Sequence, residues 1–325
     1  MFNFNGRFSL CKKHLVNQAS RAMFSLLSKG RKHDLSIDTM LDLFDKMIVP
    51  ILSYGCEIWC YEECLIIERL HLKFCKYILR VKQSTPSAMI YGELGRYPLV
   101  IKFKLLILGY WYDLANCEAN KLSKVCYQVL LTLYKEETMI SPWIQYVRNV
   151  LIECGLQYVW TNQAIGISKE WLKIVAKRTL QDIYIGKWHA DMESSSKCFL
   201  YKHFKTDFVF EKYLLHSPFQ LRRYLINFRL SNHKLPVETG RYINLERNER
   251  LCIFCDMNTL GDEYHYIMEC SNAEIAKVRN TVLPRYFRNH INMIKFAYLM
   301  NQMSLNPKTC FKLGKLVKCI MIVVK

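Results

Sequence analysis

The sequence predicts a mostly α-helical protein, and three observations lead to that prediction. Glycine and proline are scarce, at 12 and 8 of 325 residues, which disfavours sandwiches and barrels that need many tight turns. Hydrophobic residues make up 51% of the chain, so it can bury a core. Apolar residues recur at helical spacing through most of the chain.

The N-terminal segment carries three amphipathic patterns. An apolar stripe at helical spacing predicts a helix over 9–30. Ser36 is a candidate N-cap of a second helix, which Pro50 bends or ends. A third helix is expected over 64–80. Four aspartates fall along the second pattern, where they complement the helix dipole, and we assign them no catalytic role: Asp34, Asp38, Asp42 and Asp45.

Proline and glycine punctuate the next part of the chain. Thr85 and Pro86 are expected as N-cap and first helical residue, and Gly95 as the end of that helix. Pro98 opens a long apolar helix that runs toward Asn116.

A helical connector is expected beyond this region. Gly155 and Gly166 are plausible breaks within it. From residue 219, the pattern predicts a short helix with two faces. Its apolar side chains face a core, and its arginines face solvent: Leu221, Leu225 and Phe228 against Arg222, Arg223 and Arg229.

Four metal-ligating residue types follow at finger-like spacing. Cys252 and Cys255 are separated by two residues, and His265 and Cys270 by four, which gives C-x2-C-x9-H-x4-C. Two such pairs can close a tetrahedron around one Zn²⁺, and four protein ligands leave no position open for substrate. The alternative is coincidence in a chain with 14 Cys and 9 His. We expect a structural zinc in a short knuckle, and we interpret Cys56, Cys60 and Cys64 as ordinary core or surface thiols.

The charge is strongly basic, with 46 Lys and Arg against 28 Asp and Glu and a net charge of +18. From Ile275 to the end the chain has no Asp or Glu, although basic residues continue among apolar ones. A surface of this kind favours phosphate, and an anionic lipid surface is the rival. The candidate nucleic-acid contacts are Arg222, Arg223, Arg229, Arg241, Arg247, Arg250, Lys277, Arg279, Arg285 and Arg288.

Other functions are not indicated. The N-terminus has no long apolar signal region, and no stretch reaches the length of a membrane span, so we expect an intracellular protein, nuclear or cytoplasmic, that is not secreted. The chain contains no Gly-rich phosphate loop, no Gly-x-Ser-x-Gly and no His-Glu-x-x-His motif.

Several strings resemble non-LTR (LINE-type) retrotransposon reverse transcriptases. Residues 43–59, LFDKMIVPILSYGCEIW, resemble the thumb region just past the polymerase palm, and 67–79 and 89–99 continue the likeness. Residues 228–242 and the Cys/His pattern resemble the zinc-binding segment beyond the thumb. The resemblance implies a thumb-like helical bundle over 1–118, a helical connector over 119–215, and a zinc knuckle with a basic helical tail over 216–325.

The same resemblance argues against catalysis by this chain. The family's polymerase site uses a Tyr/Phe-x-Asp-Asp turn and a further Asp, whereas this chain has no Asp-Asp pair and only 42 residues precede Leu43. We therefore expect a non-catalytic C-terminal fragment that grips template RNA or target DNA. Two alternatives remain open: RNA-directed DNA polymerase activity as part of a longer product or in trans with a catalytic core, and a domesticated or decayed interaction module.

Overall fold

The computed structural model describes residues 7–138 and 141–324. Most of these residues are helical, which confirms the mostly α prediction, and the one β feature among them is an isolated antiparallel bridge between Leu251 and Leu260. The chain divides into two compact units, each assembled from several stretches of sequence. Unit 1 comprises Met1–Leu35, Thr39–His71 and Tyr97–Lys187; unit 2 comprises Ser36–Asp38, Leu72–Arg96 and Trp188–Lys325. The division into three segments at 118 and 215 stays a prediction.

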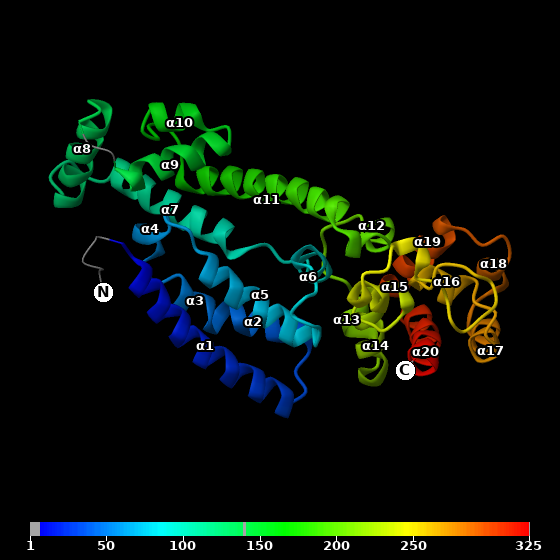
Figure 1. Ribbon diagram of the computed structural model, residues 1–325. Helices are drawn as coiled ribbons and strands as arrows, with labels where there is room; N and C mark the ends of the chain where they lie inside the picture. The colour runs from blue at the N-terminus through cyan, green and yellow to red at the C-terminus, as the bar shows by residue number, and fades with distance from the viewer. Residues whose placement is uncertain (1–6, 139–140, 325) are drawn as a thin grey trace. The chain divides into compact units, whose positions relative to one another are not determined.

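Unit 1 contains most of the long helices (Figure 1). Its helices are α1 (Ser9–Lys32), most of α2 (Ile37–Met47), α3 (Val49–Leu52), α4 (Cys56–Trp59), most of α5 (Leu65–Leu79), α7 (Leu99–Asn116), α8 (Leu122–Lys135), α9 (Pro142–Glu153), α10 (Gln157–Thr161) and most of α11 (Lys169–Ser194). The helices expected over 9–30 and 64–80, and from Pro98 to Asn116, are thus confirmed.

The glycine stops in the connector region are also confirmed. Gly155 and Gly166 adopt φ values of 71° and 74°, the left-handed conformation that ends helices. Pro98 occupies the N-cap position of α7, with φ −58° and ψ 147°. Cys56 and Cys60 are buried in unit 1, and burial raises the pKa of Cys56 to about 12, so it is held as a thiol.

Unit 2 is built from shorter helices and the C-terminal tail (Figure 1). Its elements are the end of α5, α6 (Ser87–Leu94), the end of α11, η1 (Ser196–Cys198), α12 (Tyr201–Phe204), α13 (Tyr213–His216), α14 (Phe219–Arg229), α15 (Pro236–Thr239), η2 (Gly240–Ile243), η3 (Arg247–Glu249), α16 (Glu263–Met268), α17 (Ala273–Val282), α18 (Arg285–Arg288), α19 (Met293–Leu305) and α20 (Pro307–Val323).

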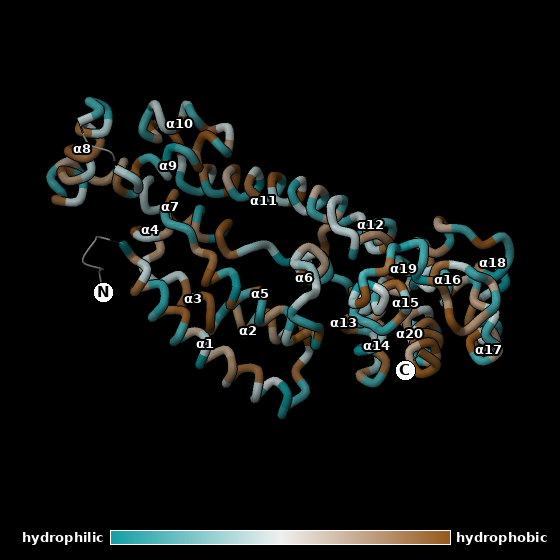
Figure 2. Tube along the Cα trace, in the orientation of Figure 1, coloured by the Kyte–Doolittle hydropathy of each residue, from teal (hydrophilic) through white to brown (hydrophobic). Residues whose placement is uncertain are grey.

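Helix α20 lies at the centre of unit 2, where it packs against α14, α17 and α19. Figure 2 shows it as strongly hydrophobic despite its lysines. One face is buried through Leu313, Leu316 and Val317. At Gly314 a side chain would meet Leu221 of α14 at 3.1 Å, so the absence of a Cβ lets the two helices approach closely. The apolar face of α20 is therefore part of the core of unit 2, although the helix belongs to the basic tail.

The tail caps its helices without carboxylates. The side chains of Asn272, Asn292 and Asn306 accept backbone N–H groups at the starts of α17, α19 and α20. Asparagine and aspartate are comparable N-caps, so neutral caps keep the helices stable while the positive charge of the tail stays unreduced.

One sequence-predicted boundary is wrong by one residue. Helix α6 begins at Ser87, and Pro86 occupies the N-cap position with an extended ψ of 139°. Thr85 is buried and precedes the cap. The end at Gly95 is confirmed, with φ 56°. Its absent Cβ would lie 2.4 Å from the backbone nitrogen of Phe210, so the close approach also requires glycine.

Candidate metal centre

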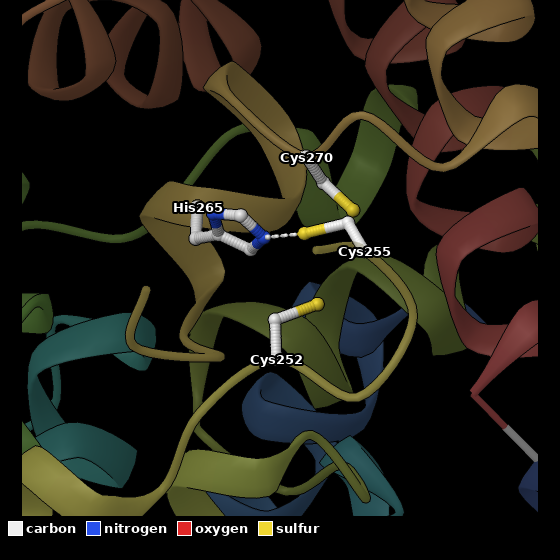
Figure 3. Close-up of side chains that lie close together, drawn as sticks. All are labelled: Cys252, Cys255, His265 and Cys270. Atoms are coloured by element: carbon white, nitrogen blue, oxygen red, sulfur yellow. Dashed lines mark hydrogen bonds between the residues drawn. The ribbon is translucent and has the colours of Figure 1, made fainter. Parts of the chain in front are cut away.

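The four Cys and His residues of the predicted knuckle converge in unit 2. One ligand atom from each of Cys252, Cys255, His265 and Cys270 lies within 4.8 Å of the other three. Figure 3 shows the sulfur atoms and the imidazole turned toward a common space, with Cys255 Sγ 3.4 Å from His265 Nε2. Three of the residues are buried and Cys255 is half-buried. This group can hold a metal ion.

A short hairpin positions the first cysteine pair. The bridge between Leu251 and Leu260 brings the two arms together, and Cys252 N donates to Thr259 O at 2.8 Å. Cys252 and Cys255 therefore sit at the closed end of a turn, where a gap of two residues lets both thiols face the same side.

Helix α16 positions the second pair. Asp262 caps it by accepting the backbone N–H of His265 at 3.0 Å. His265 then lies in the middle of the helix, and Cys270 follows its end, with Cys270 N donating back to His265 O at 2.8 Å. The sharp turn after α16 returns the Cys270 thiol toward the imidazole.

The orientation of His265 suits metal ligation through Nε2. Its other ring nitrogen, Nδ1, lies 2.9 Å from Thr259 Oγ1 and 3.6 Å from Glu269 Oε2. When Nδ1 donates to these oxygens, Nε2 presents its lone pair to the cluster. Burial lowers the pKa of His265, which favours the neutral ring that a metal requires.

The thiols differ in how readily they ionise. Burial raises the pKa of Cys270 to about 12. Burial acts to raise the pKa of Cys255 as well, but hydrogen bonds from the Met257 N–H, the Cys252 thiol and the Ser271 N–H outweigh it and hold that pKa below its ordinary value. The buried guanidinium of Arg279 donates to the carbonyl of Cys270 and places a positive charge beside the sulfurs. A metal ion that displaces the protons would add to this stabilisation.

A buried carboxylate at the start of α16 also holds the helix in place. Glu263 is buried and accepts a hydrogen bond from Ser231 Oγ at 2.8 Å, with His233 Nε2 also 2.8 Å away. Burial acts to raise the pKa of Glu263, but the neighbouring His233 more than offsets it and the pKa falls below its ordinary value. The supporting residues Thr259, Asp262, Glu263 and Arg279 carry no spacing signal and were not predicted as part of the site.

Arg229 is the clearest correction to the predicted nucleic-acid contacts. The sequence placed it on a solvent face, but its side chain is only 2% exposed. Arg229 Nε donates to Glu93 Oε1 at 2.6 Å, and Nη2 lies 3.3 Å from Glu211 Oε2. The guanidinium carbon also lies 4.7 Å from the ring centre of Phe204. This arginine is the centre of a buried ion network and has no surface to offer a ligand.

Other predicted arginines are committed within the fold. Arg241 pairs with Glu238 at 2.9 Å, and Arg247 pairs with Asp262 at 3.3 Å. Arg250 donates to the carbonyl oxygens of Val237 and Leu245. Arg279 is 9% exposed, and its bond to Cys270 places it in the metal site. Arg222, half-buried, donates to Ser217 O.

The remaining predicted cations do face solvent. Arg223 of α14, Lys277 of α17 and Arg285 of α18 are exposed, and their side chains have no partner within the part of the chain that the structure describes. Arg288 is exposed and makes one hydrogen bond, to Asn280 at 3.2 Å. Exposed lysines of α20 extend this set: Lys308, Lys312 and Lys315.

Within residues 7–138 and 141–324, no helix is both long and apolar enough to cross a membrane. Comparison with known proteins finds no matching family model, curated protein or solved structure.

Proposed function

We propose that Cys252, Cys255, His265 and Cys270 hold a structural Zn²⁺ ion. A tetrahedral zinc with bonds of about 2.3 Å to sulfur and 2.0–2.1 Å to nitrogen keeps such donors roughly 3.6 Å apart. The 3.4 Å between Cys255 Sγ and His265 Nε2 agrees with that spacing. Soft thiolates with one imidazole are the ligand set that zinc favours in structural sites. Four protein ligands leave no open position, so the ion would fold the knuckle and take no part in a reaction.

We further propose that unit 2 is a nucleic-acid-binding module, similar in role to the segment beyond the thumb of LINE-type reverse transcriptases. The observation that carries this proposal is the distribution of charge in the tail that follows the metal centre. Beyond Glu274 the chain has no carboxylate, and its exposed cations include Lys277, Arg285 and Lys312. A solvated surface normally mixes the two signs, whereas a phosphate-binding surface does not.

The helices that carry the exposed cations pack against each other, which supports a rigid binding surface. Helix α17, which carries Lys277, packs against α20, which carries Lys312. Asn272, which caps α17, also donates to Phe254 O at 3.5 Å inside the knuckle. The zinc would therefore fix the start of α17 and, through it, the direction of the basic surface.

The test measures nucleic-acid binding by the full chain across a salt series, with fluorescence anisotropy as the readout. Each phosphate contact contributes about −0.9 to the slope of log Kobs against log salt for duplex DNA and about −0.7 for a single strand. A variant with Arg223, Lys277 and Arg285 changed to Gln should lose about 2 units or more of slope. Lys135→Gln, on an exposed position of α8 in unit 1, is the matched control. A wild-type slope near zero would rule out this function.

A further inference from the structure

A second basic surface of unit 2 lies where the loop after α5 meets the start of α14 and η2. The guanidinium carbon of Arg80 lies 5.2 Å from the ring centre of Phe219. Lys82 Nζ lies 5.8 Å from the ring centre of Tyr242. Both rings are largely open to solvent, with Phe219 53% and Tyr242 69% exposed. We refer to these four residues as the aromatic platform.

The loop that supplies the two cations is held in place. Arg80 adopts φ 55°, and Val81 N donates to Lys76 O at 3.2 Å, which closes the end of α5. Lys76 Nζ then donates to Gln83 O at 2.5 Å, and Thr85 N donates to Lys82 O at 3.1 Å. Because these bonds fix the backbone, little entropy is lost when the cations bind a ligand.

Two further cations lie near the residues that carry the platform: Lys197 and Arg241. Burial lowers the pKa of Lys76, and the nearby charge of Lys197 lowers it further. Lys197 lies 3.9 Å from Glu238, whose other partner is Arg241 at 2.9 Å. Two cations therefore share that carboxylate, and the positive charges of Arg80 and Lys82 are left to attract an anion from solution.

We propose that the aromatic platform binds single-stranded nucleic acid, with bases stacking on Phe219 and Tyr242 and phosphates contacting Arg80 and Lys82. This inference rests on the proposed nucleic-acid-binding function and names the form of the ligand. Exposed rings beside cations are the usual single-strand device, because every base offers a π-face once it is unstacked. A duplex hides those faces and offers the rings nothing to stack on. The Cα atoms of residues 80 and 82 are at most roughly 7 Å apart, so the two cations can contact neighbouring phosphates.

The experiment compares two fluorescein-labelled probes on the full chain at fixed salt: oligo(dT), which forms no secondary structure, and a blunt-ended duplex of two complementary strands. Phe219→Ala and Tyr242→Ala should each weaken oligo(dT) binding by about 5- to 150-fold and leave duplex binding unchanged. Phe219→Leu, which keeps apolar volume but loses the π-face, should weaken it as well. Tyr158→Ala, which removes a ring that is 50% exposed on α10 of unit 1, is the matched control.

The outcomes separate this inference from the function on which it rests. If the wild type binds oligo(dT) and both platform variants bind it as tightly as Tyr158→Ala, the platform is wrong and the nucleic-acid function stands. If the wild type binds neither probe, both are wrong. Because both rings are exposed, their truncation should leave the thermal unfolding of the protein unchanged, which circular dichroism checks.

Discussion

Removal of Arg229 should destabilise unit 2 more than any other change of a single arginine in α14. Glu93 is fully buried and Glu211 nearly so, and Arg229 contacts both, at 2.6 Å and 3.3 Å. Arg229→Met therefore leaves the buried Glu93 without its cation, whereas Glu211 keeps its ion pair with Lys205 at 2.5 Å. Loss of one partner of a buried ion pair costs about 3–5 kcal/mol. Since whole domains have a stability of roughly 5–15 kcal/mol, this is a large part of the total.

Hydrogen exchange measured by mass spectrometry can resolve the effect by unit. Protection of peptides from α6, which carries Glu93, and from α14 should fall by roughly 150- to 5,000-fold when opening is by unit 2 as a whole. Peptides from α9 in unit 1 serve as the internal control. Arg223→Met, at an exposed position of the same helix, should change the free energy of unfolding by no more than about 0.5 kcal/mol.

A double variant tests the cause. Arg229→Met with Glu93→Met removes both charges of the closest pair, so its destabilisation should be smaller than the sum of the two single variants. Equal protection of α6 in Arg229→Met and Arg223→Met, or full additivity in the double variant, would show that the buried ion pair does not stabilise unit 2.

Three further predictions concern acid, backbone conformation and metal. Burial acts to raise the pKa of Glu211, but Arg229 and Lys205 more than offset it and lower that pKa. Because the pKa is lower in the folded state, the stabilisation is present above the ordinary carboxyl pKa and is lost as pH falls through the folded value. Hydrogen-exchange protection of α14, measured along an acid titration, should therefore begin to fall below about pH 5. Gly95→Ala should lower the free energy of unfolding by about 1 kcal/mol or more, because Gly95 has φ 56° and backbone atoms lie close to it. Gly186→Ala, at a position of α11 with open space, should raise that free energy by about 0.5–1 kcal/mol. Urea unfolding measures both, and equal effects would contradict this prediction. Chelation or His265→Ala should raise exchange around the knuckle while leaving α9 unchanged, and unaltered exchange in the knuckle would contradict a structural role for the metal.

Local patterns predicted the parts of the structure that depend on neighbours in sequence. The Cys and His cluster was predictable because the hairpin and α16 each need only a few residues to aim a ligand pair. The glycine stop at Gly95 followed from a left-handed conformation that glycine adopts easily. The one-residue error at Pro86 reflects two adjacent residues that both suit a helix start.

The burial of individual arginines could not be predicted from local patterns. Arg229 occupies a polar-looking position of α14, but its partner Glu93 lies 136 residues away in sequence. Arg279 lies on the same face of α17 as the buried Ile275 and Val282, and there it donates to the carbonyl of Cys270. The ion pair of Arg229 depends on long-range packing, for which periodicity carries no signal. Arg223, Lys277 and Arg285 are exposed and have no such partner within the described residues.

The central claim is that the four-residue cluster holds one zinc ion that folds the knuckle of unit 2. The most direct measurement is the metal content of protein purified under reducing conditions, combined with X-ray absorption at the zinc edge. We predict one zinc per chain, bound by three sulfurs at about 2.3 Å and one nitrogen at about 2.0–2.1 Å, and its loss in the variants Cys252→Ser and His265→Ala. Well-folded protein that stays metal-free when zinc is supplied, or a zinc shell dominated by oxygen, would contradict the account.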